Sequence, residues 1–206
     1  MTSTANWWNR IAQKYARSPI ADEAAYQRKL ELTREHFTPQ SEVLEFGCGT
    51  GGTAIAHAPH VRHVLATDIS EEMLIIARDK AQAAGVTNVS FERADFDTLE
   101  AGQFDAVLGL SILHLLDDPR QAIEKAYELT RPGGVFVSST ACLGDKMWFL
   151  RPVAPIMKLF GVFPPVLSFF TARELRRNIE EAGFEVEYEW RPEKAVAVFI
   201  IARRPD

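Results

Sequence analysis

The sequence predicts an α/β fold with a doubly wound, mixed sheet of seven strands. Three observations indicate this fold. After residue 42, short β-branched or aromatic runs alternate with helical windows, which is typical of strand-helix-strand units around a parallel sheet. A glycine-rich stretch directly follows the first of these runs. The last two runs are too close in sequence for a parallel crossover, so we expect the last strand to be antiparallel, in a hairpin at one end of the sheet.

The elements follow in a regular order along the chain. We expect strands at 43–46, 63–67, 89–92, 104–110, 135–139, 184–190 and 196–202. We expect helices at 6–16, 22–37, 53–58, 71–84, 119–130 and 172–182. Pro39 ends the second helix, because the residue before a proline avoids the helical conformation. Gly85 and Gly183 stand where helices should stop, and Thr171 and Glu174 have capping-box spacing.

The composition sets the class of protein. The chain has 206 residues, of which 47% are hydrophobic and 25% charged, so we expect one globular domain over 1–206 with a helical cap at 1–40. Its formal net charge of −5 argues against nucleic acid as a partner. Cys48 and Cys142 lie far apart and no secretory or membrane-spanning apolar stretch is evident, so we expect a reducing, cytoplasmic setting.

The glycine-rich stretch is the main functional signal. Gly47, Gly49 and Gly52 fit the G-x-G-x-x-G spacing of dinucleotide sites, and Asp68 ends the next strand about 20 residues later. Glycine allows a sharp turn and lets a ligand lie against bare peptide groups at the carboxyl end of a strand. A carboxylate at the position of Asp68 would accept hydrogen bonds from the two hydroxyls of an unmodified ribose.

Further motifs narrow this interpretation. Glu45 precedes Gly47, Gly49 and Gly51 in an acidic-x-G-x-G-x-G pattern, and additional matching segments occur at 95–96, 104–107 and 131–135. In order and spacing these motifs resemble class I S-adenosylmethionine-dependent methyltransferases, over most of the chain. The segment 8–15 is also similar to the N-terminal helix of the ubiquinone and menaquinone C-methyltransferases.

This resemblance implies a Rossmann-like fold, S-adenosylmethionine as the cofactor and S-adenosylhomocysteine as its product. It implies that Glu45 meets the ammonium group of the cofactor, that Asp68 meets the ribose, and that Asp95 and Phe96 meet the adenine. The other cofactor-binding positions that it implies are Tyr15, Gly47, Cys48, Gly49, Ile69 and Leu110. No metal is expected.

Three positions have more than one interpretation at this point. Cys48 has no neighbouring base in the sequence and is expected to fill space rather than react. His114 follows the fourth strand, as a general base or as a loop histidine that packs on the cofactor. The cofactor's carboxylate needs donors, which the amides of 47–49 could supply together with Lys14, Tyr15 or Arg17.

The segment 143–170 interrupts the regular rhythm after the fifth strand. It is rich in aromatic residues and contains four prolines, which exclude one long helix. We expect it to lie as a lid or wall over the carboxyl edge of the sheet. It could form an apolar pocket for a lipophilic or amphiphilic small-molecule acceptor, contact a membrane through 146–170, or add to the core or a dimer surface.

The expected reaction is an in-line methyl transfer to an oxygen, nitrogen or carbon atom of this acceptor. Two alternatives stand beside it. One is a protein that binds S-adenosylmethionine without turnover, as a sensor or accessory subunit. The other is an NAD-dependent oxidoreductase, which the acidic residue before the glycines and the lack of chain for a separate substrate domain disfavour. The sequence leaves the oligomeric state open.

Overall fold

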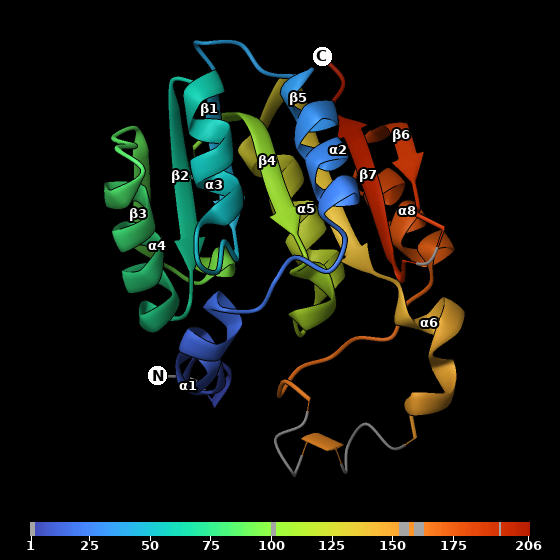
Figure 1. Ribbon diagram of the computed structural model, residues 1–206. Helices are drawn as coiled ribbons and strands as arrows, with labels where there is room; N and C mark the ends of the chain where they lie inside the picture. The colour runs from blue at the N-terminus through green and yellow to red at the C-terminus, as the bar shows by residue number, and fades with distance from the viewer. Residues whose placement is uncertain (1–2, 100–101, 153–156, 159–162, 194) are drawn as a thin grey trace.

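A seven-stranded mixed sheet forms the centre of the computed structural model (Figure 1). The structure describes residues 3–99, 102–152, 157–158, 163–193 and 195–206. The strands are β1 (Glu42–Phe46), β2 (His63–Asp68), β3 (Val89–Arg93), β4 (Phe104–Leu110), β5 (Thr130–Ala141), β6 (Glu185–Trp190) and β7 (Ala197–Arg203). Their order in the sheet is β3-β2-β1-β4-β5-β7-β6.

The pairing confirms the predicted mixed sheet. Strands β3, β2, β1, β4 and β5 pair in parallel, whereas β7 is antiparallel to both β5 and β6. The chain order reverses between β1 and β4, and ligands of open α/β sheets bind at the carboxyl ends of the strands beside such a reversal.

Helices cover both faces of the sheet. They are α1 (Ser3–Ala16), α2 (Glu23–Arg34), α3 (Gly52–His57), α4 (Glu71–Ala83), α5 (Pro119–Leu129), α6 (Leu143–Lys146) and α8 (Ala172–Glu181), with short 3-10 turns η1 (Ala58–His60), η2 (Phe96–Thr98), η3 (Leu113–Leu115) and η4 (Trp148–Leu150). Alternate strand residues face opposite layers: Val43 packs in the cluster that includes Leu32 of α2, and Leu44 in the cluster that includes Ile123 of α5. Figure 1 shows α2 and α3 in front of the sheet and α5 and α8 behind it.

Most boundaries match the prediction, and the largest difference lies at β5. Helix α5 ends at Leu129 rather than at residue 130, because Thr130 already pairs with Phe104 of β4. Strand β5 therefore extends over Thr130–Ala141, well beyond the predicted 135–139. The structure confirms the predicted helix ends before Gly85 and Gly183, which have φ values of +67° and +104°. It also confirms the capping box of Thr171 and Glu174.

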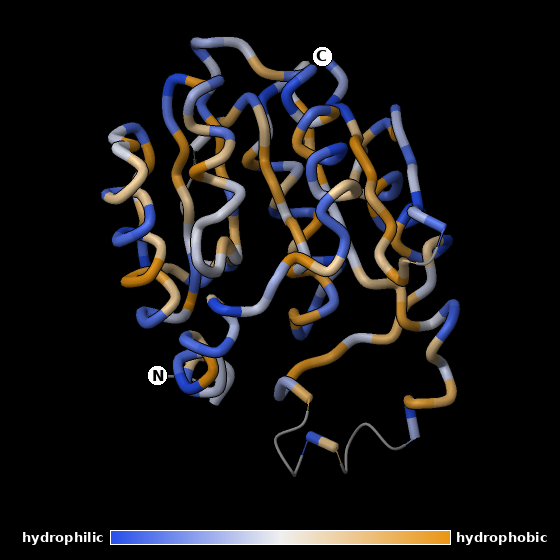
Figure 2. The backbone as a smooth tube through the Cα atoms, viewed as in Figure 1, coloured by the Kyte–Doolittle hydropathy of each residue, from blue (hydrophilic) through white to orange (hydrophobic). Residues whose placement is uncertain are grey.

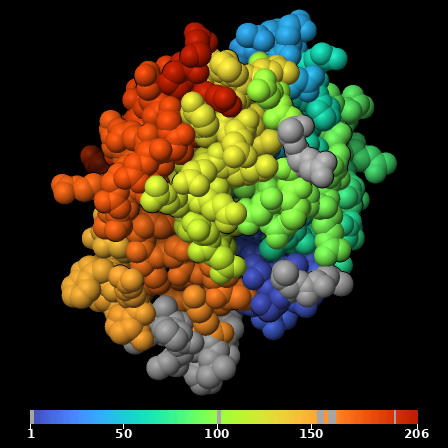
Figure 3. Space-filling view, turned by 180° about the vertical axis from the view of Figure 1, so that it is seen from behind, coloured from blue at the N-terminus to red at the C-terminus, as the bar shows by residue number. Residues whose placement is uncertain are grey.

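The described part of the segment 143–170 lies below the carboxyl ends of the strands, beside α1. Figure 3 shows the two side by side at the lower edge of the molecule, seen from behind. Figure 2 shows that the stretch leading from this segment back towards α8 is largely hydrophobic. Among the described helices, none is long and apolar enough to cross a bilayer.

Candidate cofactor and acceptor sites

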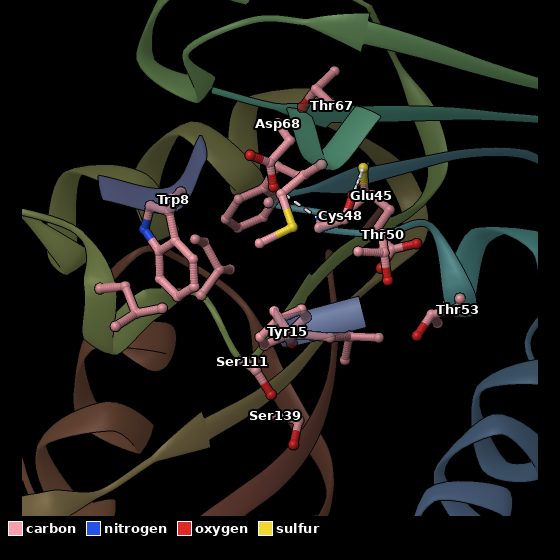
Figure 4. Close-up of a pocket in the computed structure, with 18 of the residues that line it drawn as sticks. Trp8, Tyr15, Glu45, Cys48, Thr50, Thr53, Thr67, Asp68, Ser111 and Ser139 are labelled. Atoms are coloured by element: carbon pink, nitrogen blue, oxygen red, sulfur yellow. Dashed lines mark hydrogen bonds between the residues drawn. The ribbon is translucent and has the colours of Figure 1, made fainter. Parts of the chain in front are cut away.

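A cavity of about 720 Å³ opens at the carboxyl ends of the central strands. Its volume is within the range of small-molecule sites. We call it the cofactor pocket. Its walls come from α1, α2, the loops after β1, β2 and β4, and the end of β5. Figure 4 shows Asp68 on one side of it, Ser111 and Ser139 on the opposite side, and Tyr15 between them.

The loop after β1 requires glycine for two physical reasons. Gly47 has φ +64°, and a β-carbon there would lie 2.5 Å from Ile112 Cγ1. Gly51 has φ +73° at the start of α3, and a β-carbon there would lie 2.8 Å from Ala77 Cβ. Gly47, Gly49 and Gly51 have a positive φ, whereas Gly52 does not. Gly51 is therefore the third glycine on which the turn depends. This favours the acidic-x-G-x-G-x-G interpretation over the dinucleotide spacing.

Asp68 links the glycine loop to the end of β2. The Gly49 N–H donates to its Oδ2 at 2.9 Å, and the Ser70 N–H donates to its Oδ1 at 2.8 Å. Burial raises the pKa of Asp68, and the backbone donors of Ser70, Gly49 and Ile69 act in the opposite direction. A carboxylate has about four lone-pair sites, so each oxygen keeps capacity for a further donor such as a ribose hydroxyl.

Replacing Asp68 by alanine is expected to weaken binding of S-adenosylhomocysteine by about 1–3 kcal/mol, the cost of losing a hydrogen bond to a charged group. Titration calorimetry measures this change. Because the Asp68 carboxylate also accepts from Gly49, the urea midpoint of Asp68→Ala and of Asp68→Asn must be measured as a control. Wild-type affinity in a folded Asp68→Ala protein would remove Asp68 from the site.

Glu45 is buried at the floor of the cofactor pocket, with 3% of its surface exposed. Burial raises its pKa to about 8; the Ala54 N–H lowers it in part, and the charge of Asp68 raises it further. Its Oε2 atom is buried and has no hydrogen-bond partner. A buried carboxylate oxygen without a donor is costly, so the pocket favours a ligand with a cationic donor at this point.

Asp95 and Phe96 follow β3 and line the same pocket, in different environments. Asp95 is exposed at the rim. Phe96 is 5% exposed and stacks on Phe46, with ring centroids 3.8 Å apart. The stacking occupies part of the Phe96 ring surface, so Phe96 belongs to the hydrophobic core as well as to the pocket wall.

The remaining predicted positions also come together. Tyr15, Gly47, Cys48, Gly49, Ile69 and Leu110 all line the cofactor pocket. Burial, followed by the charges of Glu45 and Asp68, raises the pKa of the Cys48 thiol well above its usual value, which agrees with a space-filling role. Lys14 and Arg17 are not among the residues that line this pocket, unlike Tyr15 beside them.

A second cavity, of about 350 Å³, lies next to the cofactor pocket, and we call it the acceptor pocket. Trp8, Tyr15, Ser111 and Leu115 line both cavities. The rest of its wall is mainly apolar and comes from the ends of β4 and β5 and from the segment 143–170: His114, Ala141, Leu143, Met147, Leu150, Phe163, Pro164, Leu167 and Phe169. The described part of that segment therefore contributes side chains to the wall of this cavity.

His114 lies in the wall of the acceptor pocket and not of the cofactor pocket. Burial lowers its pKa to about 4, so the imidazole is neutral at pH 7. Its Nδ1 atom is buried without a partner. Its backbone carbonyl accepts from the Ser168 N–H at 2.8 Å, which ties the segment 143–170 to the loop after β4.

The sequence analysis did not single out several polar residues of the cofactor pocket, among them Lys29, Ser111 and Ser139. Lys29 had a detectable signal, because it is four residues after Ala25 and three before Leu32, on the buried side of α2. Ser111 had no such signal in the sequence, because its φ of +60° arises only in the folded loop. Ser139 continues the alternation of Val135 and Val137, which pack on the same face.

Comparison with known proteins agrees with this geometry. A family described as "Methyltransferase domain" matches residues 43–134. The Ubiquinone biosynthesis O-methyltransferase of Coxiella burnetii is 26% identical over 191 residues, which are 88% of this chain and 77% of that protein. The methyltransferase AacuQ of Aspergillus aculeatus is 30% identical over 130 residues, or 63% of this chain, and the chain spans 41% of its length. The crystal structure of a SAM-dependent methyltransferase, possible histamine N-methyltransferase, from Thermotoga maritima has a TM-score of 0.70 at 20% identity, covering 98% of this chain and 99% of that one.

The fold and the site together define a class I S-adenosylmethionine-dependent methyltransferase. Within this class the chain is related to the ubiquinone methyltransferases. Its cofactor is S-adenosylmethionine, and the residues present fit this molecule. Glu45 offers an unpaired carboxylate oxygen, Asp68 has free lone pairs, and the glycine loop between them presents bare backbone.

Proposed function

We propose that the protein transfers the methyl group to a small, lipophilic or amphiphilic molecule bound in the acceptor pocket. The observation that supports this most directly is the junction of the two cavities, which share Trp8, Tyr15, Ser111 and Leu115. The acceptor pocket is lined largely by aromatic and aliphatic side chains. An apolar molecule in this pocket would present one end to the cofactor pocket across that junction.

The contribution of the chain is mainly to bind, orient and exclude water. When bound, S-adenosylmethionine supplies an electrophilic methyl group on its sulfonium. Glu45 would hold the ammonium of this molecule and Asp68 its ribose, and Asp95 would meet the adenine. Tyr15 and Trp8 lie at the junction, where they cover the site and keep water away. Such positioning can supply roughly 7–11 kcal/mol of barrier reduction.

We assign His114 to contact with the acceptor. Its unpaired Nδ1 could accept a hydrogen bond from an acceptor hydroxyl. A pKa of about 4 makes it a weak general base at neutral pH, so its contribution is expected to be orientation of the acceptor's body more than proton removal. His114→Gln would keep a hydrogen-bond acceptor at this position. Comparing its KM and kcat with those of His114→Ala separates orientation of the substrate from proton removal.

The relatives favour oxygen as the attacked atom, since several are named as O-methyltransferases of ubiquinone biosynthesis. The proposal is tested by transfer of a labelled methyl group to a metabolite and lipid extract. Transfer to a lipophilic product supports it, whereas tight binding of S-adenosylmethionine without transfer to any component would indicate the non-catalytic alternative. Binding of NAD in place of S-adenosylmethionine would indicate the oxidoreductase.

We also propose that 1–40 and 143–170 together cover the site within one domain, and that the second of these contacts a membrane in the cytoplasm. Trp148 and Phe149 support this, because 68% and 56% of their surfaces are exposed. Lys146, Arg151 and Lys158 lie in the same segment and could meet anionic headgroups. A lipophilic acceptor could then enter from the bilayer.

Replacing Trp148 and Phe149 by alanine is expected to reduce binding to phosphatidylglycerol vesicles by about tenfold or more, because two large apolar side chains no longer enter the interface. Vesicle sedimentation measures this binding. The exposed Ile75 of α4, replaced by alanine, is the matched control. Equal sedimentation of the wild type and the double variant would contradict the proposed membrane contact.

A further inference from the structure

Lys29 is a cation that α2 directs into the cofactor pocket. It is half-buried, and its Nζ donates to Ser139 Oγ, 2.8 Å away, at the carboxyl end of β5. A lysine on a surface helix ordinarily extends its ammonium into water. Here the ammonium lies against the sheet, where Ser139 is 3% exposed and also lines the pocket. Lys29 and Ser139 form what we call the lysine-serine pair.

The charge of Lys29 is not balanced within the described part of the chain. No described carboxylate lies within 4.0 Å of its Nζ. Burial lowers the pKa of Lys29, and the negative charge of Asp22 opposes this shift. Asp22 caps α2 by accepting from the Ala25 N–H at 2.9 Å. An ammonium has three donors, and the pair with Ser139 uses one of them.

We propose that the lysine-serine pair is a binding site for an anionic oxygen of the acceptor, either a carboxylate or an acidic hydroxyl. A partly buried cation is stabilised by a charged oxygen that takes its remaining donors. This inference rests on the proposed function and goes further, because it assigns the chemical class of the acceptor. The acceptor would have an apolar body in the acceptor pocket and an acidic oxygen at Lys29.

The position of the pair favours the acceptor over the cofactor's own carboxylate. Strand β4 separates β1, which holds Glu45, from β5, which holds Ser139, so the two lie about 10 Å apart across the sheet. Ser139 is instead next to the junction of the two cavities. The Ser111 N–H donates to the Ser139 carbonyl at 2.7 Å, and Ser111 lines both cavities. Figure 4 shows Ser111 and Ser139 side by side, away from Asp68.

The chemistry of transfer is consistent with this site. An oxygen lone pair of the acceptor forms a bond to the methyl carbon while the carbon–sulfur bond breaks, and that electron pair stays on sulfur as a neutral thioether. An acceptor that enters as an oxyanion leaves as a neutral ester or ether, with no proton to dispose of. The product then no longer pairs with the charge of Lys29, which favours its release.

The test compares binding of 4-hexylbenzoate with its neutral isostere 4-hexylbenzamide, in protein saturated with S-adenosylhomocysteine. We expect the wild type to bind the benzoate about 10-fold to 100-fold more tightly than the amide. In Lys29→Met, measured at concentrations of S-adenosylhomocysteine that saturate the variant, this preference should fall to less than about threefold. Lys125→Met, a lysine-to-methionine change on α5, is the matched control.

Each other outcome overturns the inference in a distinguishable way. Equal binding of benzoate and benzamide by the wild type would show that Lys29 selects no anion, while the acceptor pocket stands. A Lys29→Met protein that loses affinity for S-adenosylhomocysteine, but keeps it for 5′-methylthioadenosine, would assign Lys29 to the cofactor's carboxylate. Binding of neither aromatic probe by a protein that binds S-adenosylhomocysteine would overturn the apolar acceptor pocket itself.

Discussion

Replacing Glu45 by glutamine is expected to weaken binding of S-adenosylhomocysteine by at least about tenfold and, at pH 8, to stabilise the ligand-free protein. Both effects have the same origin. The Oε2 atom of Glu45 is buried without a donor, so the folded protein without ligand holds a carboxyl group in an unfavourable place. The ammonium of the cofactor supplies the missing donor, and glutamine has no negative charge to meet it.

The pH dependence of stability follows from the direction of the pKa shift. Burial raises the pKa of Glu45 from 4.5 to about 8, so the folded state binds the proton more tightly than the unfolded state does. The stability from this difference is fully present below about pH 4.5 and is lost as the pH rises through 8. The glutamine variant has no such loss. Its advantage should therefore grow between pH 5 and 9 to roughly 4 kcal/mol at most.

Cofactor affinity should show a complementary dependence. Near pH 7 the Glu45 carboxyl is mostly protonated and must lose its proton to pair with an ammonium, because its pKa is about 8. Affinity in the wild type should therefore rise between pH 6 and 7.5, with proton release on binding, whereas in Glu45→Gln it should be flat. The upper limit keeps the measurements below the titration of the ligand's own amino group.

Calorimetry in two buffers of different ionisation enthalpy counts the released protons, and urea titrations at pH 5 and 8 give the free energy of unfolding. Glu42→Gln is the matched control, since Glu42 stands at the opposite end of β1 and pairs with Arg62 at 3.3 Å. It should change neither cofactor affinity nor its pH dependence. A Glu45→Gln protein with wild-type affinity would show that Glu45 does not hold the ammonium.

The cofactor side of the site was predictable from sequence because local rules determine it. A strand that runs into glycines, with an acid at the next strand end, places Glu45, Gly47 and Asp68 at one edge of a parallel sheet. Boundaries were less predictable where pairing overrides local preference. Thr130 is the example: it continues the sequence of α5 but joins β5, because Phe104 pairs with it.

The acceptor side was less predictable, because long-range packing determines it. The segment 143–170 was recognisable as apolar, but the wall that it forms with Trp8 and Tyr15 depends on how α1 packs below the sheet. His114 was recognisable as a candidate, but its place in the acceptor pocket and its lowered pKa come from burial in the folded protein. Lys29 and Ser139 are 110 residues apart, and no local pattern links them.

Filling the acceptor pocket is expected to separate the two halves of the site. Ala141 is the last residue of β5 and lines this pocket, but not the cofactor pocket. In Ala141→Trp the indole should occupy space that an acceptor needs, while the adjoining cavity stays open. We expect labelled methyl transfer to a lipophilic acceptor to fall by about 100-fold or more, which corresponds to the loss of productive binding.

The affinity for S-adenosylhomocysteine should stay within about threefold of wild type, because the substitution is outside the cofactor pocket. Overpacking a filled core costs about 1–3 kcal/mol, whereas a side chain that enters an open cavity costs less, so the urea midpoint distinguishes steric block from misfolding.

Ala141→Ser introduces a side chain close in size to that of alanine, so this control variant should keep most of the activity. The loss in Ala141→Trp should also be graded, smallest for short acceptors and largest for long ones. Undiminished transfer to a long acceptor by a folded Ala141→Trp protein would place the acceptor elsewhere, and the segment 143–170 would then be a structural cover.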